Sequence, residues 1–132
     1  MDTSPEYIKQ CDCPEIRDSI IKCDTIPNIY AYQPCPPYYE GEEIGYEIGD
    51  FYELRNLERD NPYKIVWLPR QDQIQDMLFA EDLLNGDIGY VVHRLWYFEN
   101  KGGYNSSSMQ QLWLAFYMKE KHNKTWSGKE WV

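Results

Sequence analysis

A proline at position 69 separates two segments of opposite character. Before it, Tyr63–Leu68 is rich in β-branched and aromatic residues, which favour a strand. After it, apolar residues recur at helical spacing between Arg70 and Leu84. Proline lacks a backbone N–H and has a fixed φ, so it ends a strand and suits the first helical position. The sequence therefore predicts a strand-to-helix corner at Leu68-Pro69.

A second β-prone run lies upstream of that strand. Gly49-Asp50 opens Phe51–Leu54, and the turn-rich residues 58–62 follow. Two β-prone runs around a cluster of turn residues are typical of an antiparallel hairpin. We therefore predict a hairpin over Asp50–Leu68.

Further helices are predicted on both sides of this hairpin. Residues 5–10 and 14–24 read as short helices, and Asp87 can cap a helix that ends at Lys101-Gly102-Gly103. Ser108, with a glutamine three residues later, forms a capping-box pattern before the apolar run Met109–Met118, which we expect to be buried on most sides. Residues 126–131 close the chain with a turn that can fold two indoles onto the body.

Length and composition indicate one α+β domain. A chain of 132 residues matches the commonest domain size, and its 42% hydrophobic and 16% aromatic residues exclude general disorder. We predict a single domain over 1–132, with a small antiparallel sheet packed against three or four helices. Within it, residues 1–49 are a Cys-, Pro- and Tyr-rich N-terminal part and residues 50–132 an α+β core.

The segment from Thr25 to Gly49 combines prolines, tyrosines and acids. Its proline density excludes a regular helix, and we expect a long connection that lies against the body. Residues 30–47 are therefore a candidate contact surface. Its predicted partner-binding residues are Tyr38, Tyr39, Glu40, Glu42 and Glu43.

The four cysteines all fall within the first 35 residues. Zinc sites use two tight cysteine pairs, but here only one pair is close, with a single intervening residue. A metal site, disulfide bonds and free thiols are the three alternatives for these cysteines. We expect free thiols that act as small hydrophobic side chains. These residues are Cys11, Cys13, Cys23 and Cys35.

The charge and the start of the chain limit the partners. A formal charge of −9 repels nucleic acid and anionic lipid, so we expect no direct binding to either. Met1–Glu6 does not open a signal peptide, and no apolar run reaches the roughly 18 residues of a membrane span. We therefore expect a cytoplasmic protein. Exposed aromatic residues make a homo-oligomer possible.

The sequence contains no recognisable catalytic motif. A Gly-rich phosphate loop, a nucleophile elbow and a zinc-binding His-Glu-x-x-His are all missing. His93 and His122 have no neighbouring acid and nucleophile, and we interpret both as structural. We expect a protein that is not an enzyme and uses no cofactor.

The corner at residue 69 is the predicted ligand site. Free N–H groups at a helix start and a guanidinium can hold an anion while an indole stacks on a base. The alternative is that Arg70 pairs with Asp72 and the amides only cap the helix. The candidate residues are Trp67, Arg70, Gln71 and Gln73.

Three segments carry a resemblance to a known family. They are Trp67–Gln73 (WLPRQDQ), Leu112–Lys121 (LWLAFYMKEK), and Trp126 with Trp131. Residues 50–132 resemble a family of small uncharacterised proteins encoded by bacterial phages and prophages. The resemblance implies no activity, but it places the protein among phage accessory genes, in an infected bacterial host.

Three functions follow as hypotheses. The first is a non-catalytic phage-type binding protein that counters host defence by sequestering a nucleotide-like signal. The second is an acidic inhibitor that occupies a basic surface of a host protein through residues 30–47. The third is a structural or regulatory component of the phage.

Overall fold

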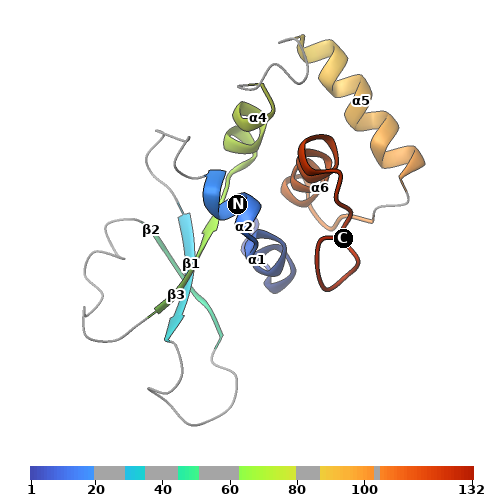
Figure 1. Cartoon of the computed structure of the whole chain (residues 1–132). Coiled ribbons are helices and arrows are strands. Elements are labelled where there is room, and N and C mark those ends of the chain that lie inside the picture. The colour runs from blue at the N-terminus through green and yellow to red at the C-terminus, as the bar shows by residue number, and fades with distance from the viewer. Residues whose placement is uncertain (20–28, 35–44, 51–62, 80–86, 103–104) are drawn as a thin grey trace. The chain divides into compact units, whose positions relative to one another are not determined.

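The computed structural model describes residues 1–19, 29–34, 45–50, 63–79, 87–102 and 105–132. These residues form five helices and a three-stranded antiparallel sheet, so the α+β prediction is confirmed (Figure 1). They group into two compact units. We call Thr3–Pro69 the sheet unit, and Arg70–Val132 together with Met1–Asp2 the helical unit. That the chain is a single domain stays a prediction.

The sheet has the order β2-β1-β3. Strand β1 (Ile29–Pro34) lies in the middle and pairs antiparallel with both β2 (Glu47–Asp50) and β3 (Tyr63–Leu68). Strand β3, the predicted second strand of the hairpin over Asp50–Leu68, is bonded to β1 in the described sheet, and the hairpin itself stays a prediction. The predicted partner, Phe51–Leu54, lies outside the described residues.

The expectation of a long connection between Thr25 and Gly49 is corrected by the structure. Its described residues include the central strand β1 and part of the edge strand β2. Proline excludes a helix but tolerates a strand end, and Pro34 is the last residue of β1. The inward residue of β1, Ala31, is fully buried.

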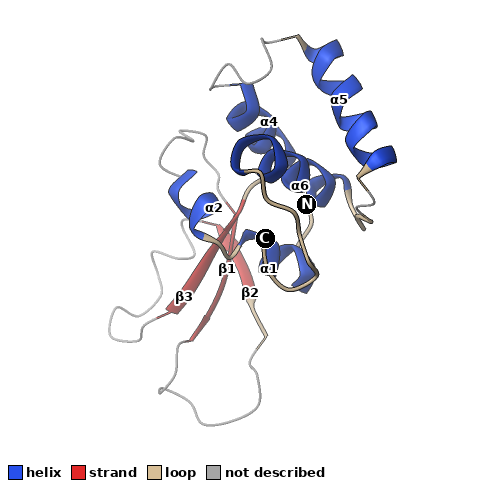
Figure 2. Ribbon diagram, turned by 45° about the vertical axis from the view of Figure 1, so that its right-hand side comes forward, coloured by secondary structure: helices blue, strands red, loops and turns tan. Residues whose placement is uncertain are grey.

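One face of the sheet carries the apolar residues that pack against α1 (Pro5–Cys11). Residues paired across antiparallel strands share a face, so Ala31, Val66 and Leu68 lie together, and all three are buried. Helix α1 begins with Ser4 as its N-cap and packs on β3, which α2 (Pro14–Ser19) also contacts (Figure 2).

The predicted corner exists, with its helix starting one residue later than expected. Helix α4 (Gln71–Phe79) has Arg70 as its N-cap, because the Arg70 carbonyl accepts from the N–H of Ile74 at 3.0 Å. The Arg70 N–H in turn donates to Oε1 of Gln73 at 2.9 Å. Pro69 therefore lies before the N-cap and is not the first helical residue. The side chain of Gln73 accepts a hydrogen bond from the backbone N–H of the N-cap residue, and proline has no such N–H.

The helical unit is built around α6 (Met109–His122). Helices α4 and α5 (Ile88–Lys101) both pack against it, and residues 111–118 are buried without exception, as predicted. The predicted caps are confirmed: Asp87 accepts from the N–H groups of Gly89 and Tyr90, and Ser108 from that of Gln111. None of the described helices has the length and apolar character needed to cross a membrane.

The predicted closing turn forms after α6. Trp126 and Trp131 make an antiparallel bridge with ring centroids 5.1 Å apart, and Trp131 is buried. Gly128 has a φ of 94°, a conformation that favours glycine.

Asp2 extends the cap of α6 from the other end of the chain. Its carboxylate accepts from the Ser108 hydroxyl and, at 2.9 Å, from Nε2 of Gln111. A carboxylate at a helix N-terminus is favoured by the helix dipole. We expect Asp2→Ala to lower the free energy of unfolding by about 1–2 kcal/mol in a urea titration. Asp18→Ala, at an exposed position, is the control and should change it by less than about 0.5 kcal/mol.

Candidate functional site

The predicted ligand residues at the corner are divided between the two units. Trp67 belongs to β3 in the sheet unit and is 5% exposed, whereas Arg70, Gln71 and Gln73 belong to the helical unit. The Arg70 guanidinium binds Asp72 through two contacts, Nε to Oδ1 at 3.0 Å and Nη2 to Oδ2 at 2.9 Å, and this lowers the pKa of Asp72. Gln73 is fully buried and caps α4. The ligand site stays a prediction, with its guanidinium and one amide already bound locally.

Trp67 lies beside a small cavity of the sheet unit. The cavity has a volume of about 150 Å³ and is also lined by Cys11, Tyr30 and Ile65. That volume is below the roughly 300 Å³ at which small-molecule sites begin. The indole Nε1 is buried, and it has no hydrogen-bond partner in the described part of the chain. This cavity is too small for a nucleotide.

Some of the other predicted site residues lie within the described ranges of the structure, and some lie outside them. Cys11 and Cys13 are buried free thiols. No cluster of three or more potential metal ligands occurs within the described ranges. His93 stacks on Trp96 of the same helix, with ring centroids 6.3 Å apart. Several predicted residues lie outside the described ranges: Cys23, Cys35, Tyr38, Tyr39, Glu40, Glu42 and Glu43.

A larger pocket opens between α1 and the sheet, and we call it the α1 pocket. Its volume is about 540 Å³, within the range of roughly 300–1,000 Å³ that small-molecule sites occupy. Gln33 and Lys64 lie opposite each other in β1 and β3, so both belong to the face that α1 covers. The lining residues that the structure describes belong to the sheet unit: Thr3, Pro5, Ile8, Lys9, Asp12, Gln33, Gly45, Tyr46, Ile48 and Lys64.

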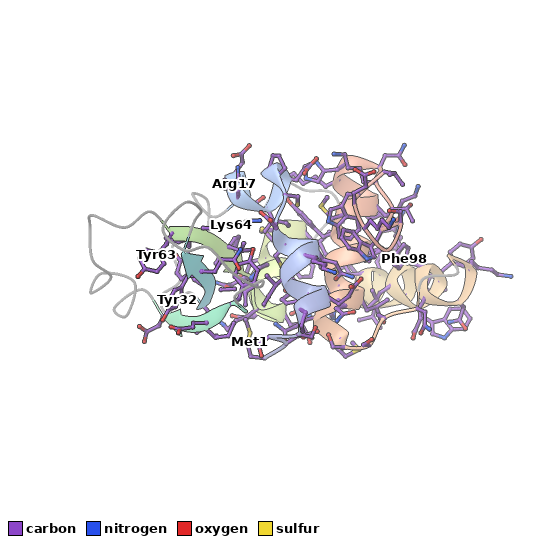
Figure 3. The ribbon with its side chains drawn as sticks, turned by 90° about the horizontal axis from the view of Figure 1, so that it is seen from below. Met1, Arg17, Tyr32, Tyr63, Lys64 and Phe98 are labelled. Carbon is purple, nitrogen blue, oxygen red and sulfur yellow. The ribbon has the colours of Figure 1, made fainter. Side chains whose placement is uncertain are left out.

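Lys64 is held in its charged form inside this pocket. Its ammonium forms an ion pair with Asp12, and Tyr46 interacts with it electrostatically. The hydrogen bond to Asp12 raises the pKa of Lys64, and Tyr46 adds to this, while partial burial lowers it; the net direction is upward. Figure 3 shows Lys64 on the side of the sheet that faces the N-terminal helices. Lys64 therefore acts as a fixed cation.

Lys9 supplies a second cation on the helix side of the α1 pocket. It is exposed, and within the described ranges it has no ion-pair partner. Asp12 is the one acid among the described lining residues, and it is engaged by Lys64 and, at 3.8 Å, by Arg17. The described lining residues thus carry a positive excess in a chain whose formal charge is −9.

The rest of the α1 pocket is apolar or aromatic. Pro5, Ile8 and Ile48 line it, with Ile8 buried, and Tyr46 adds an aromatic ring to the lining. Apolar walls with a few placed polar groups are typical of small-molecule sites. The arrangement can hold a planar group against Tyr46 and Ile48 while the lysines bind an anionic group.

Gln33 and Tyr46 fall within the predicted contact surface of residues 30–47, but the sequence did not predict them, or the two lysines, as ligand residues. Lys9, Gln33, Tyr46 and Lys64 lie in three strands or strand ends and one helix, and none forms a motif with its neighbours. Only the pairing of β1 with β3 places Gln33 beside Lys64. The one local signal is Lys64 within an otherwise aromatic and β-branched strand.

Comparisons with known proteins add no relative. A scan against models of known protein families, a search of curated proteins and a search of solved structures each found no match to this chain.

Proposed function

We propose that this chain is a non-catalytic binding protein that sequesters a small anionic, nucleotide-like molecule in the α1 pocket. The observation that carries the proposal is a 540 Å³ pocket with two lysines, one of them without an ion pair among the described residues, in a strongly acidic chain. An anion meets a favourable local charge only where such a positive excess exists.

The shape and lining of the pocket favour a nucleotide-like ligand over a simple ion. Its volume exceeds what phosphate alone needs, and its apolar walls lie beside the Tyr46 ring. Aromatic rings stack on bases, lysines bind phosphate, and an amide such as that of Gln33 can read the edge of a base. The sequence predicted the same class of ligand at Trp67 and Arg70, but neither residue is among the described residues that line the α1 pocket.

The chemistry of the α1 pocket favours binding over catalysis. A lysine serves as a base or nucleophile when its pKa falls toward neutrality, whereas the contacts of Lys64 raise its pKa. Among the described residues that line the pocket there is neither a histidine nor a cysteine. The resemblance to a phage-encoded family suggests an accessory role that counters host defence. Binding a signal molecule without converting it agrees with that role.

The first test is a thermal-shift screen of the full chain, followed by calorimetry. The probes are adenosine monophosphate, cyclic mononucleotides and dinucleotides, ADP-ribose, adenosine and inorganic phosphate. We expect at least one nucleotide to raise the melting temperature, and adenosine to have no effect because it lacks the anionic group. No shift with any nucleotide would sink the proposal.

The second test assigns the site by substitution. Lys9→Gln should weaken binding of the active nucleotide about 10-fold or more, since a charge-assisted hydrogen bond is lost. Lys64→Gln should weaken it further, because one cation is lost and Asp12 then faces the anion without its lysine partner. Lys129→Gln, at an exposed position of the helical unit, is the matched control and should bind as the parent does. Parent-like binding by Lys9→Gln and Lys64→Gln would move the site elsewhere.

A further inference from the structure

The α1 pocket carries an acid next to its lysines. Asp12 lies directly after α1, where its backbone N–H donates to the carbonyls of Ile8 and Lys9 at 3.0 and 3.3 Å. Its carboxylate lines the pocket and pairs with the Lys64 ammonium. An acid in a site for anions repels the ligand, and the repulsion grows with the negative charge that the ligand carries.

The charges of the described lining residues sum to a single positive charge. Lys9 and Lys64 are cations, and Asp12 offsets one of them. The hydrogen bond from Lys64 to Asp12 is the main cause of the raised pKa of Lys64, so these two charges act as a pair. Arg17 reaches Asp12 only at 3.8 Å and is not among the described lining residues. The lining therefore matches a ligand with one negative charge, for which Lys9 is the unpaired cation within the described ranges.

Phosphate esters differ in the charge that they bring to such a pocket. A phosphodiester carries one negative charge, as in the backbone of DNA, whereas a phosphomonoester carries about −1.5 to −2 at pH 7. Pyrophosphates and dinucleotides carry a charge on each of two phosphates. Their second charge finds no further cation among the described lining residues, and it faces the Asp12 carboxylate.

The apolar part of the lining favours the ligand with the smaller charge. The side chains of Pro5, Ile8 and Ile48 offer no hydrogen bond to a phosphate oxygen. Moving a charged group out of water costs more free energy as its charge rises, unless new hydrogen bonds and ion pairs replace the lost hydration. A monoanionic diester loses less hydration free energy in this pocket than a dianionic monoester does.

We infer that the α1 pocket selects monoanionic phosphodiesters of a single nucleoside, such as cyclic mononucleotides, over phosphomonoesters, pyrophosphates and dinucleotides, and that Asp12 sets this preference. The inference rests on the function proposed above and narrows its class of ligand. Asp12 acts here as a specificity-determining residue, because it penalises the second negative charge of a ligand more than it weakens binding of the first.

Calorimetry on the full chain tests the preference. The probes are the 5′-monophosphate, its methyl ester and the 3′,5′-cyclic monophosphate of adenosine, guanosine, cytidine and uridine, together with ADP-ribose and a cyclic dinucleotide. At about pH 7.5 the monophosphate is a dianion, and its methyl ester is a monoanion of nearly the same shape. For at least one nucleoside, we expect the ester and the cyclic nucleotide to bind at least about 10-fold more tightly than the monophosphate.

The outcomes distinguish this inference from the proposed function. Equal or tighter binding of the monophosphate, ADP-ribose or the dinucleotide would overturn the inference and leave the proposed function standing. A methyl ester that binds as weakly as the monophosphate would show that the ring of the cyclic nucleotide is selected and not its charge, which also overturns the inference. If no nucleotide binds, the proposed function fails, and the inference fails with it.

Asp12→Asn tests the assigned residue. It removes the carboxylate but keeps the backbone N–H that caps α1, and we expect circular dichroism to show a folded chain. The monophosphate should gain at least about 10-fold in affinity, and its difference from the methyl ester should fall to within about 3-fold. Asp18→Asn, at an exposed position of α2 outside the described lining, is the matched control and should keep the preference of the parent. An unchanged preference in Asp12→Asn would contradict the role of Asp12.

Discussion

Phe116→Ala is expected to lower the free energy of unfolding by about 3–5 kcal/mol. Phe116 is 1% exposed in the middle of α6, with its ring centroid 5.6 Å from that of Phe98 and 6.2 Å from that of Trp113. Removing the ring leaves a cavity between α5 and α6, and the neighbouring aromatic rings are too rigid to collapse into it. Net stabilities of small domains are only about 5–15 kcal/mol, so this loss is a large share.

Urea denaturation followed by far-UV circular dichroism measures this effect. Met109→Ala lies in the same helix at a position 54% exposed, and it is expected to change the free energy of unfolding by less than about 0.5 kcal/mol. A loss below about 1 kcal/mol for Phe116→Ala would show that α6 is not the centre of its unit.

Tyr7→Ala is expected to cost a similar 3–5 kcal/mol in the sheet unit. Tyr7 is fully buried in α1, and its hydroxyl donates to the carbonyl of Pro69, directly after β3. The ring holds the helix on the sheet, and the hydroxyl satisfies a buried carbonyl. Both contributions disappear in the alanine variant.

Tyr7→Phe separates the hydrogen bond from the packing. It keeps the ring but leaves the Pro69 carbonyl without its phenol donor, and we expect a loss of about 1–3 kcal/mol. Tyr97→Phe, at a position 56% exposed, is the control and should change the free energy of unfolding little. If Tyr7→Phe were as stable as the parent, the bond to Pro69 would carry no net stabilisation.

The two variants together test the prediction of a single domain. Phe116 lies in the helical unit and Tyr7 in the sheet unit. If the chain unfolds as one domain, each variant shifts one common transition, and tryptophan fluorescence and circular dichroism report the same midpoint. Two separate transitions, with each variant affecting only one, would show that the units unfold independently.

Local chemistry explains why much of the helical unit was predictable. The caps of α5 and α6 depend on Asp87 and Ser108 and on residues within three positions of them, so the sequence displays both partners. The corner at Pro69 was predicted one residue out of place, because the reach-back bond from Gln73 to the Arg70 N–H decides where α4 starts. That bond is local too, but it competes with the preference of proline for the first helical position.

Non-local pairing explains what was missed in the sheet unit. The strand that pairs with β3 lies about 30 residues earlier, in a segment whose prolines indicated a connection. The α1 pocket depends on this pairing, because it brings Lys64 beside Gln33 and beneath α1. Lys9, Gln33 and Lys64 line the same pocket, but their positions in the sequence form no pattern that would predict this.

The sequence by itself determined the α+β class, the helix caps, the burial of α6 and the closing turn, since each depends on contacts between near neighbours in the chain. The tertiary structure alone decided the strand order, the described residues that line the α1 pocket, and which apolar residues of α5 are buried. Val91 and Val92 are consecutive apolar residues of α5, and only the packing of the helix on α6 decides that Val91 is buried and Val92 is exposed. Strand register and helix packing join residues that are far apart in the chain, and the free energy of those contacts has no signature in a local pattern.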